Sequence, residues 1–228
     1  IKEILSGLES MEEKKNLINK QEEKSLNTAL YYTAKLGYLD AAEILVENGA
    51  DINIESLGSF TPLHTAAAYG NTKVAIYLVN QGANINVVQS SGCATGYTAF
   101  NWAIEKNNLE LLRAMRSKNA DPYAGRIHPL VQARTMVLVK LLVEEYNIKP
   151  TQNVLDTLEK AIKNHDKQYD TYYENQKKIY NYLLHAGTVS STIKVSSSLK
   201  GKDTSYKHFE PFDINDEASV SDKKKKRR

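Results

Sequence analysis

The residues that could do chemistry in this chain are five histidines and one cysteine, and their spacing decides whether they could act together. No histidine pair has the HExxH spacing and none has a cysteine beside it, so we expect no metal site. Cys93 has no neighbour in the sequence that would lower the pKa of its thiol, which favours a spectator role. The histidines are His64, His128, His165, His185 and His208.

Nucleotide and cofactor chemistry is not indicated either. Gly92 and Gly96 lie in a Gly/Ser-rich stretch, but they lack the Lys and Ser that a phosphate-binding loop needs. No nucleophile, base and oxyanion set can be assembled from the motifs. We therefore expect no enzymatic activity, no cofactor and no small-molecule substrate.

Charge and cysteine content restrict the class of protein further. The 228 residues carry 30 Lys and Arg against 27 Asp and Glu, but six of the cations lie in Lys223–Arg228. Without that run the balance is 24 against 27, or −3, so the body gives no electrostatic case for nucleic acid. A single cysteine cannot form an internal disulfide, which fits a reducing compartment, and no apolar run has the length of a membrane span. We expect an intracellular protein, cytoplasmic or nuclear.

A pair of short helices is predicted between Phe60 and Asn86. Thr61 is a natural N-cap and Pro62 a natural first helical residue, because a hydroxyl accepts an unpaired N–H and proline has none to leave unpaired. Gly70 then breaks the first helix, and Gly82 suits the left-handed end of the second. The apolar face of the second helix consists of Val74, Ile76, Leu78 and Val79. Such a pair has a bare hydrophobic side that stacked neighbours must cover.

The neighbours occur at a fixed spacing. Thr28 stands 33 residues before Thr61, and Gly37, Gly49 and Asn53 stand 33 before Gly70, Gly82 and Asn86. With this period, Thr61-Pro62-Leu63-His64 and Gly82-Ala83-Asn84-Ile85-Asn86 make the chain similar to the ankyrin-repeat family. The resemblance implies an all-α solenoid of stacked helix-turn-helix units with short hairpin loops. It also implies that His64 forms hydrogen bonds near helix one and has a structural role.

We expect about four repeats over residues 26–150. Repeat one has helices near residues 28–35 and 39–47. Repeat three begins at Thr98, 37 residues after Thr61, so the connection 87–97 should be a longer, mobile finger, and Asn119 replaces the usual glycine. Repeat four opens at His128, and its turn is compressed and lacks glycine, which predicts irregular geometry.

The ends of the chain depart from the repeat pattern. Residues 1–25 have apolar residues at helical spacing and are predicted to form an N-terminal helical cap; the alternative is a partner-binding amphipathic helix. Residues 151–187 are predicted to form a Tyr-rich C-terminal helical cap, and residues 188–228 a disordered Ser/Thr/Lys-rich basic tail. The tail ends in a basic run that fits a nuclear signal, an export signal or a solvated terminus: Lys223, Lys224, Lys225, Lys226, Arg227 and Arg228.

The resemblance also implies where a partner protein binds, namely the hairpin tips and the inner face of helix one. Among these positions Tyr69 and Trp102 stand out, because large aromatics with a polar edge are frequent hot spots. The alternative is that both simply pack on the next repeat. The matching positions are Glu55, Leu57, Ser59 and Phe60 in the hairpin, Tyr32, Lys35 and Leu36 in repeat one, Thr65, Ala68 and Tyr69 in repeat two, and Trp102, Glu105 and Lys106 in repeat three.

The sequence therefore predicts a monomeric, non-catalytic protein–protein interaction module. Frequent Lys, Asn, Ile and Tyr suggest an AT-rich genome, so one setting is an effector that an intracellular microbe secretes into its host cell. A second is a nuclear or chromatin-associated adaptor directed by the basic tail. A third is the targeting domain of a larger enzyme.

Overall fold

A computed structural model describes residues 2–7, 10–92, 95–163 and 170–187. All of them belong to one compact unit, Ile1–Ser191, and the second unit, Thr192–Arg228, lies outside the described residues together with the predicted tail. The described secondary structure is helical apart from an isolated bridge between Ser56 and Phe60. The predicted all-α fold is confirmed.

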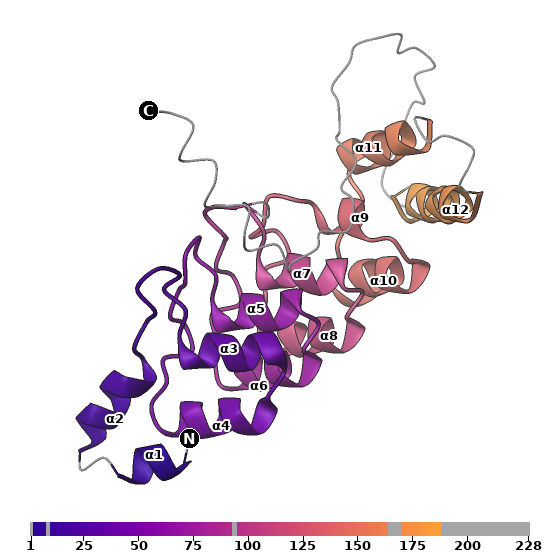
Figure 1. The fold of residues 1–228 in the computed structure, drawn as a ribbon. Helices are drawn as coiled ribbons and strands as arrows, with labels where there is room; N and C mark the ends of the chain where they lie inside the picture. The colour runs from indigo at the N-terminus through magenta and orange to yellow at the C-terminus, as the bar shows by residue number, and fades with distance from the viewer. Residues whose placement is uncertain (1, 8–9, 93–94, 164–169, 188–228) are drawn as a thin grey trace, which may run out of the picture. The chain divides into compact units, whose positions relative to one another are not determined.

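Three regular helix pairs form the middle of the unit. The first helices of the pairs pack on one another in order, and the second helices form a parallel row behind them (Figure 1). The predicted bounds of both helices in repeat one are confirmed to within one residue. The pairs are α3 (Ala29–Leu36) with α4 (Leu39–Glu47), α5 (Pro62–Ala68) with α6 (Thr72–Asn80), and α7 (Ala99–Glu105) with α8 (Leu109–Ser117).

A threonine begins each first helix. The hydroxyls of Thr28, Thr61 and Thr98 each accept the backbone N–H three residues later, at 3.2, 3.3 and 3.3 Å. Two of these caps are reciprocal, since the side chains of His64 and Asn101 accept the N–H of their threonine in return. The caps place equivalent side chains of successive helices in line, which is what lets the helices stack.

Left-handed residues end each second helix of the regular pairs. Gly82 has φ 87° and Asn119 has φ 57°, so the predicted replacement of glycine by asparagine is confirmed. The core lies between the two rows of helices. One large side chain from the first turn of each repeat is almost fully buried there: Leu30, Leu63, Phe100 and Leu130.

Repeat four is irregular, as its compressed turn predicted. Its first helix, α9 (Pro129–Gln132), is a single turn that ends at Ala133 in extended conformation. Its second helix begins as α10 (Met136–Lys140) and continues as a π-helix, η1 (Leu141–Glu145). The turn has no left-handed residue because the chain leaves α9 extended.

The π-helix accommodates one extra residue. Eleven positions separate the residue before helix two from the left-handed residue after it in the regular repeats, as from Asn71 to Gly82. Twelve separate Thr135 from Asn147, which has φ 54°. A π turn bonds i to i+5 and so holds one more residue than an α turn. The Tyr146 N–H accordingly donates to the Leu141 carbonyl at 3.2 Å.

Deleting the exposed Glu144 should therefore convert η1 to α-helix while both ends keep their register. We expect the free energy of unfolding to fall by only about 1 kcal/mol, the net value of the exposed hydrogen bond that Tyr182 donates to Glu144. The matched control deletes exposed Arg113 from α8, which has no inserted residue. This deletion would rotate the buried side chain of Met115 away from the core. The urea concentration at half-unfolding measures the stability of both deletion variants. Equal losses of stability in the two variants would contradict the interpretation that helix two of repeat four contains one inserted residue.

The N-terminal segment is helical in part, and its role as a cap stays a prediction. It forms two short helices, α1 (Lys2–Ser6) and α2 (Met11–Ile18), and Met11 is 72% exposed. Ile18 is the one buried side chain of α2. Next to it, Asn19 accepts the Asp51 N–H at 2.7 Å, so the last turn of α2 is attached to repeat one.

The C-terminal helices continue the stack. α11 (Gln152–Lys163) packs on α9, and α12 (Asp170–Gly187) packs on α10 and on α11. These contacts make α11 and α12 a fifth helix pair without the motif of the earlier ones. Their buried side chains include Val154, Leu155, Leu158, Ile179 and Leu183.

Candidate functional site

The first helices present two aligned rows of side chains. The threonine caps place Tyr32, Thr65 and Trp102 four residues after the cap, and Leu36, Tyr69 and Lys106 eight residues after it. Residues four apart lie on the same face of a helix. The two rows therefore run across repeats one to three on one face of the first helices.

Thr65 does not belong to an accessible surface. Its side chain is 1% exposed, and its hydroxyl donates to the Thr61 carbonyl at 3.2 Å. Ala68, one turn later, is 2% exposed. The predicted contact of these two residues with a partner is therefore wrong, because α5 consists of small residues that its neighbours cover.

Trp102 is partly buried and tightly held. Its indole N–H donates to the Gln89 side-chain carbonyl at 3.2 Å, and its ring lies 5.1 Å from the Tyr97 ring. Gln89 belongs to the finger, whose base is closed by bonds from Gln89 N–H to the Tyr97 carbonyl and from Gly96 N–H to the Gln89 carbonyl. Trp102 thus fastens the finger to α7 as well as facing solvent in part.

Tyr32 and Tyr69 are also fixed by their neighbours. Tyr32 is 41% exposed and its hydroxyl donates to Glu22 at 3.0 Å, while Tyr69 lies beneath the ammonium of Lys35, 5.5 Å from the ring centre. The pKa of the Glu22 carboxyl is lowered most by the hydrogen bond from Ser25 and next by the one from Tyr32. Leu36, in the same row as Tyr69, is 57% exposed.

The two charged candidates of repeat three differ. Glu105 forms an ion pair with Arg134 at 3.1 Å and accepts from the Gln132 amide at 3.4 Å, so its carboxylate is committed within the protein. Lys106 is exposed at the end of α7. Of these two residues, only Lys106 is free of such contacts within the described ranges and exposed enough to pair with a negative charge on a partner.

The hairpin before α5 is held to both of its neighbours. Leu57 N–H donates to the Ser25 carbonyl at 3.1 Å, and Ser90 N–H donates to the Gly58 carbonyl at 3.0 Å. Leu57 itself is 59% exposed at the tip, whereas Phe60 is half-buried with its ring 6.2 Å from His64. Glu55 is exposed on the same hairpin.

His64 has a structural position, as the motif implied. It is fully buried, its Nδ1 lies 2.8 Å from the Thr61 hydroxyl, and its Nε2 lies 3.0 Å from the Val87 carbonyl. Nδ1 accepts the Thr61 N–H, so the ring proton resides on Nε2 and donates to Val87. Burial lowers the pKa of His64 to about 4, and the bond to Val87 opposes that shift.

The remaining chemistry-bearing residues form no cluster in the described ranges. His128 accepts the Leu130 N–H at 3.2 Å, and no three His, Cys, Asp or Glu side chains there lie close enough to hold a metal ion. None of the helices in the described ranges combines the length and apolar character of a bilayer-spanning segment. Cys93, His165, His208 and the basic run Lys223–Arg228 lie outside the described residues.

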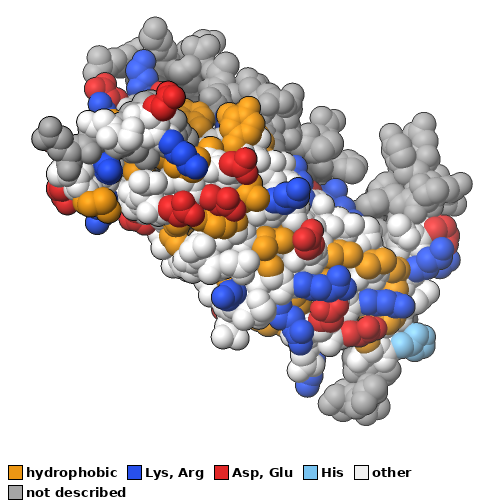
Figure 2. Space-filling model, turned by 90° about the horizontal axis from the view of Figure 1, so that it is seen from below, with side chains coloured by type: hydrophobic (Ala, Val, Ile, Leu, Met, Phe, Trp, Pro, Cys, Tyr) orange, Lys and Arg blue, Asp and Glu red, His pale blue; other side chains and the backbone are white. Residues whose placement is uncertain are grey.

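The second-helix side of the unit has a mixed surface. Figure 2 shows small groups of hydrophobic side chains between acidic and basic ones on the face seen there. The two aligned rows of side chains, the hairpins and the stacked helix pairs together define a helical repeat protein whose first helices and hairpin tips form its candidate binding surface.

Comparison with known proteins identifies the repeats. A family model described as ankyrin repeats in three copies matches residues 56–125, and one described as ankyrin repeats in many copies matches residues 30–79. The chain is an ankyrin-repeat protein, with the repeats recognised over residues 30–125. The predicted family is therefore confirmed.

Relatives among curated proteins match a short segment. Protein phosphatase 1 regulatory subunit 12A from Mus musculus and from Rattus norvegicus are each 43% identical to this chain over 47 residues. That segment is 21% of this chain and 5% of each relative. The likeness is thus confined to about a twentieth of those proteins.

Proposed function

We propose that this chain is a non-catalytic module that binds a partner protein through the first helices of repeats one to three and the adjoining hairpin. We call this surface the helix-one face. The observation that carries the proposal is the alignment of Tyr32, Tyr69 and Trp102, all at least partly exposed, with Leu36 and Lys106 at two recurring helix positions. The helix-one face consists of Tyr32, Leu36, Leu57, Tyr69, Trp102 and Lys106.

The fixed positions of these side chains support binding. Tyr32 donates to Glu22, Tyr69 lies under Lys35, and Trp102 donates to Gln89, so each ring is already ordered in the free protein. Ordering a flexible side chain at an interface costs about 0.5–1.5 kcal/mol. Aromatic rings that are ordered beforehand avoid much of that cost and present large apolar faces.

The names of the relatives suggest regulation through protein contacts. Both are regulatory subunits of a protein phosphatase by name, and repeat scaffolds act by presenting a surface. A match to 5% of those proteins supports the type of scaffold rather than a phosphatase partner. The comparisons give no support to secretion into a host cell, so the proposal is confined to the binding surface.

Affinity capture from a lysate with the full chain, followed by calorimetry with the isolated partner, tests the proposal. We expect Tyr69→Ala to weaken binding about thirtyfold, the effect of losing a hot-spot aromatic worth about 2 kcal/mol. Leu36→Ala should weaken it several-fold. The matched control is Val137→Ala on α10, because Leu36 and Val137 are 57% and 59% exposed.

Circular dichroism and melting curves must show that each variant remains folded. If Leu36→Ala and Val137→Ala have the same affinity as the parent, and Tyr69→Ala does too, the helix-one face is not the binding surface. The Tyr-rich helix α12 would then be examined next.

A further inference from the structure

The charges of the repeats divide along the chain. Residues 1–97 carry seven Lys and Arg against 11 Asp and Glu, whereas residues 98–150 carry eight against five. Repeats three and four are therefore basic, next to an acidic first half. A positive region of this kind attracts negatively charged partners over distances of about 10 Å at moderate salt.

A depression of about 610 Å³ lies in this basic region, between the end of α8 and the end of η1. It is on the second-helix side and does not include the helix-one face. Its lining combines two guanidinium groups, one carboxylate and several polar groups. The lining includes Arg113, Arg116, Ser117, Asn119, Glu145 and Tyr146.

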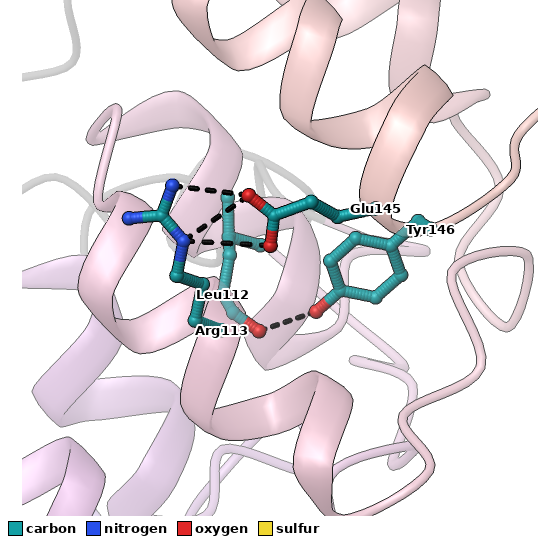
Figure 3. A network of polar contacts seen from close by, with 4 residues as sticks. All are labelled: Leu112, Arg113, Glu145 and Tyr146. Carbon is teal, nitrogen blue, oxygen red and sulfur yellow. Dashed lines mark hydrogen bonds and ion pairs between the residues drawn. The ribbon is translucent and has the colours of Figure 1, made fainter.

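The π-helix shapes one wall of the depression. The extra residue in helix two places Tyr146 against repeat three, where its hydroxyl donates to the Leu112 carbonyl (Figure 3). The Tyr146 ring also meets the Phe100 ring edge-on, with the ring centres 5.1 Å apart. Burial raises the pKa of the Tyr146 hydroxyl above its usual value. The equivalent residues Asn48, Gln81 and Lys118 of the regular repeats are polar. This wall is therefore peculiar to the junction of repeats three and four.

The two arginines of the depression differ in what they already bind. Arg113 faces Glu145, with Nη2 3.0 Å and Nε 3.2 Å from Oε1 (Figure 3), and the hydrogen bond to Glu145 raises the pKa of the guanidinium. Arg116 is exposed and forms no ion pair within the described ranges. Neither α4 nor α6 has a basic residue in its last turn, so a cation at this position is not a requirement of the helix end.

We propose that this depression binds an acidic segment of a protein partner. Arg116 makes the first contact with a partner carboxylate, and a second carboxylate takes the place of Glu145 on Arg113. Arginine suits this role because its planar fork donates two parallel hydrogen bonds to a carboxylate. The site is separate from the helix-one face, so its test does not depend on the function proposed above.

The test is a titration of the full chain into fluorescein-labelled octaglutamate, followed by anisotropy at about 0.15 M salt to limit non-specific attraction. We expect saturable binding that Arg116→Ala weakens about tenfold. Arg134→Ala is the control with the same charge change, because Arg134 is similarly exposed and lies on the other side of repeat four, paired with Glu105.

The second part of the test looks for a variant that binds octaglutamate more tightly. Glu145→Gln should strengthen octaglutamate binding several-fold because it releases Arg113. Glu47→Gln is its control, since Glu47 also ends helix two, but in repeat one. Equal losses in Arg116→Ala and Arg134→Ala, equal gains in the two glutamate variants, or binding that does not saturate would each overturn the proposal. Melting curves verify that all four variants are folded.

Discussion

Acidification from pH 7 to pH 4 is expected to cost this protein about 3 kcal/mol of stability through His64 alone. The pKa of His64 is lowered to about 4 in the folded protein, against about 6.5 when unfolded. Between these values the unfolded chain binds a proton that the folded one excludes. The stabilisation is therefore complete above pH 6.5, falls as the pH falls, and is lost below about pH 4, at about 1.4 kcal/mol per pKa unit.

His64→Asn isolates this contribution from the titration of the carboxylates. Repeat three already carries Asn101 at the same position, where its side-chain oxygen accepts the Thr98 N–H at 3.0 Å and its amide donates to the Ile127 carbonyl at 3.4 Å. Asparagine can thus form both kinds of bond and does not titrate. Its smaller side chain lowers stability at every pH, so the slope is the quantity to compare.

Urea unfolding at pH 4, 5, 6 and 7 measures the slope for both proteins. We expect the variant to lose less stability than the parent between pH 6.5 and pH 4. If the two curves of stability against pH run parallel, His64 is not the source of the acid sensitivity. The structural role of the buried ring would then need another explanation.

The parts of the fold that sequence reasoning predicted correctly are those decided within a few residues. The caps at Thr28, Thr61 and Thr98 depend on an N–H three residues away. The left-handed turn at Asn119 depends on the backbone freedom of a single residue. Such features recur at the same spacing, so the helix pairs could be located from the sequence.

The site could be predicted only in part, because exposure depends on residues far along the chain. Trp102 is held by Gln89, 13 positions earlier, and Glu105 is neutralised by Arg134, 29 positions later. Thr65 is buried although it aligns with exposed Tyr32. Helical spacing identifies the shared face, but it does not show which neighbour covers a small residue.

The π-helix left a trace that could have been found in the sequence. Counting from Thr135 to Asn147 gives one residue more than from Asn108 to Asn119. Asn147 is the left-handed end of helix two, and no glycine marks it in the sequence. With that residue aligned, the insertion and therefore the π turn follow.

Gly37→Ala is expected to destabilise the protein by about 3 kcal/mol, more than Gly70→Ala at the equivalent position one repeat later. Both glycines are left-handed, with φ 77° and 73°, where a side chain costs about 1–2 kcal/mol. A Cβ on Gly70 meets nothing within 4 Å. Gly70→Ala should therefore show the backbone cost alone.

A Cβ added at Gly37 would collide with the side chain of Asn71, whose hydrogen bonds join repeats one and two. It would lie 2.7 Å from the Asn71 side-chain oxygen, too close for contact. The amide of that same Asn71 donates to the Ala34 carbonyl at 2.7 Å and to the Lys35 carbonyl at 2.8 Å, which closes the end of α3. Moving Asn71 would weaken two hydrogen bonds, each worth about 0.5–1.5 kcal/mol, in addition to the backbone cost.

A double-mutant cycle separates the two costs. Asn71→Ala removes both hydrogen bonds and also the atom that the new Cβ would strike, so Gly37→Ala should cost only about 1–2 kcal/mol in that background. Gly70→Ala, measured in both backgrounds by urea unfolding, should cost the same in each. If Gly37→Ala costs equally with and without Asn71, then the two residues are not coupled, and the amide of Asn71 does not join repeats one and two as the structure indicates.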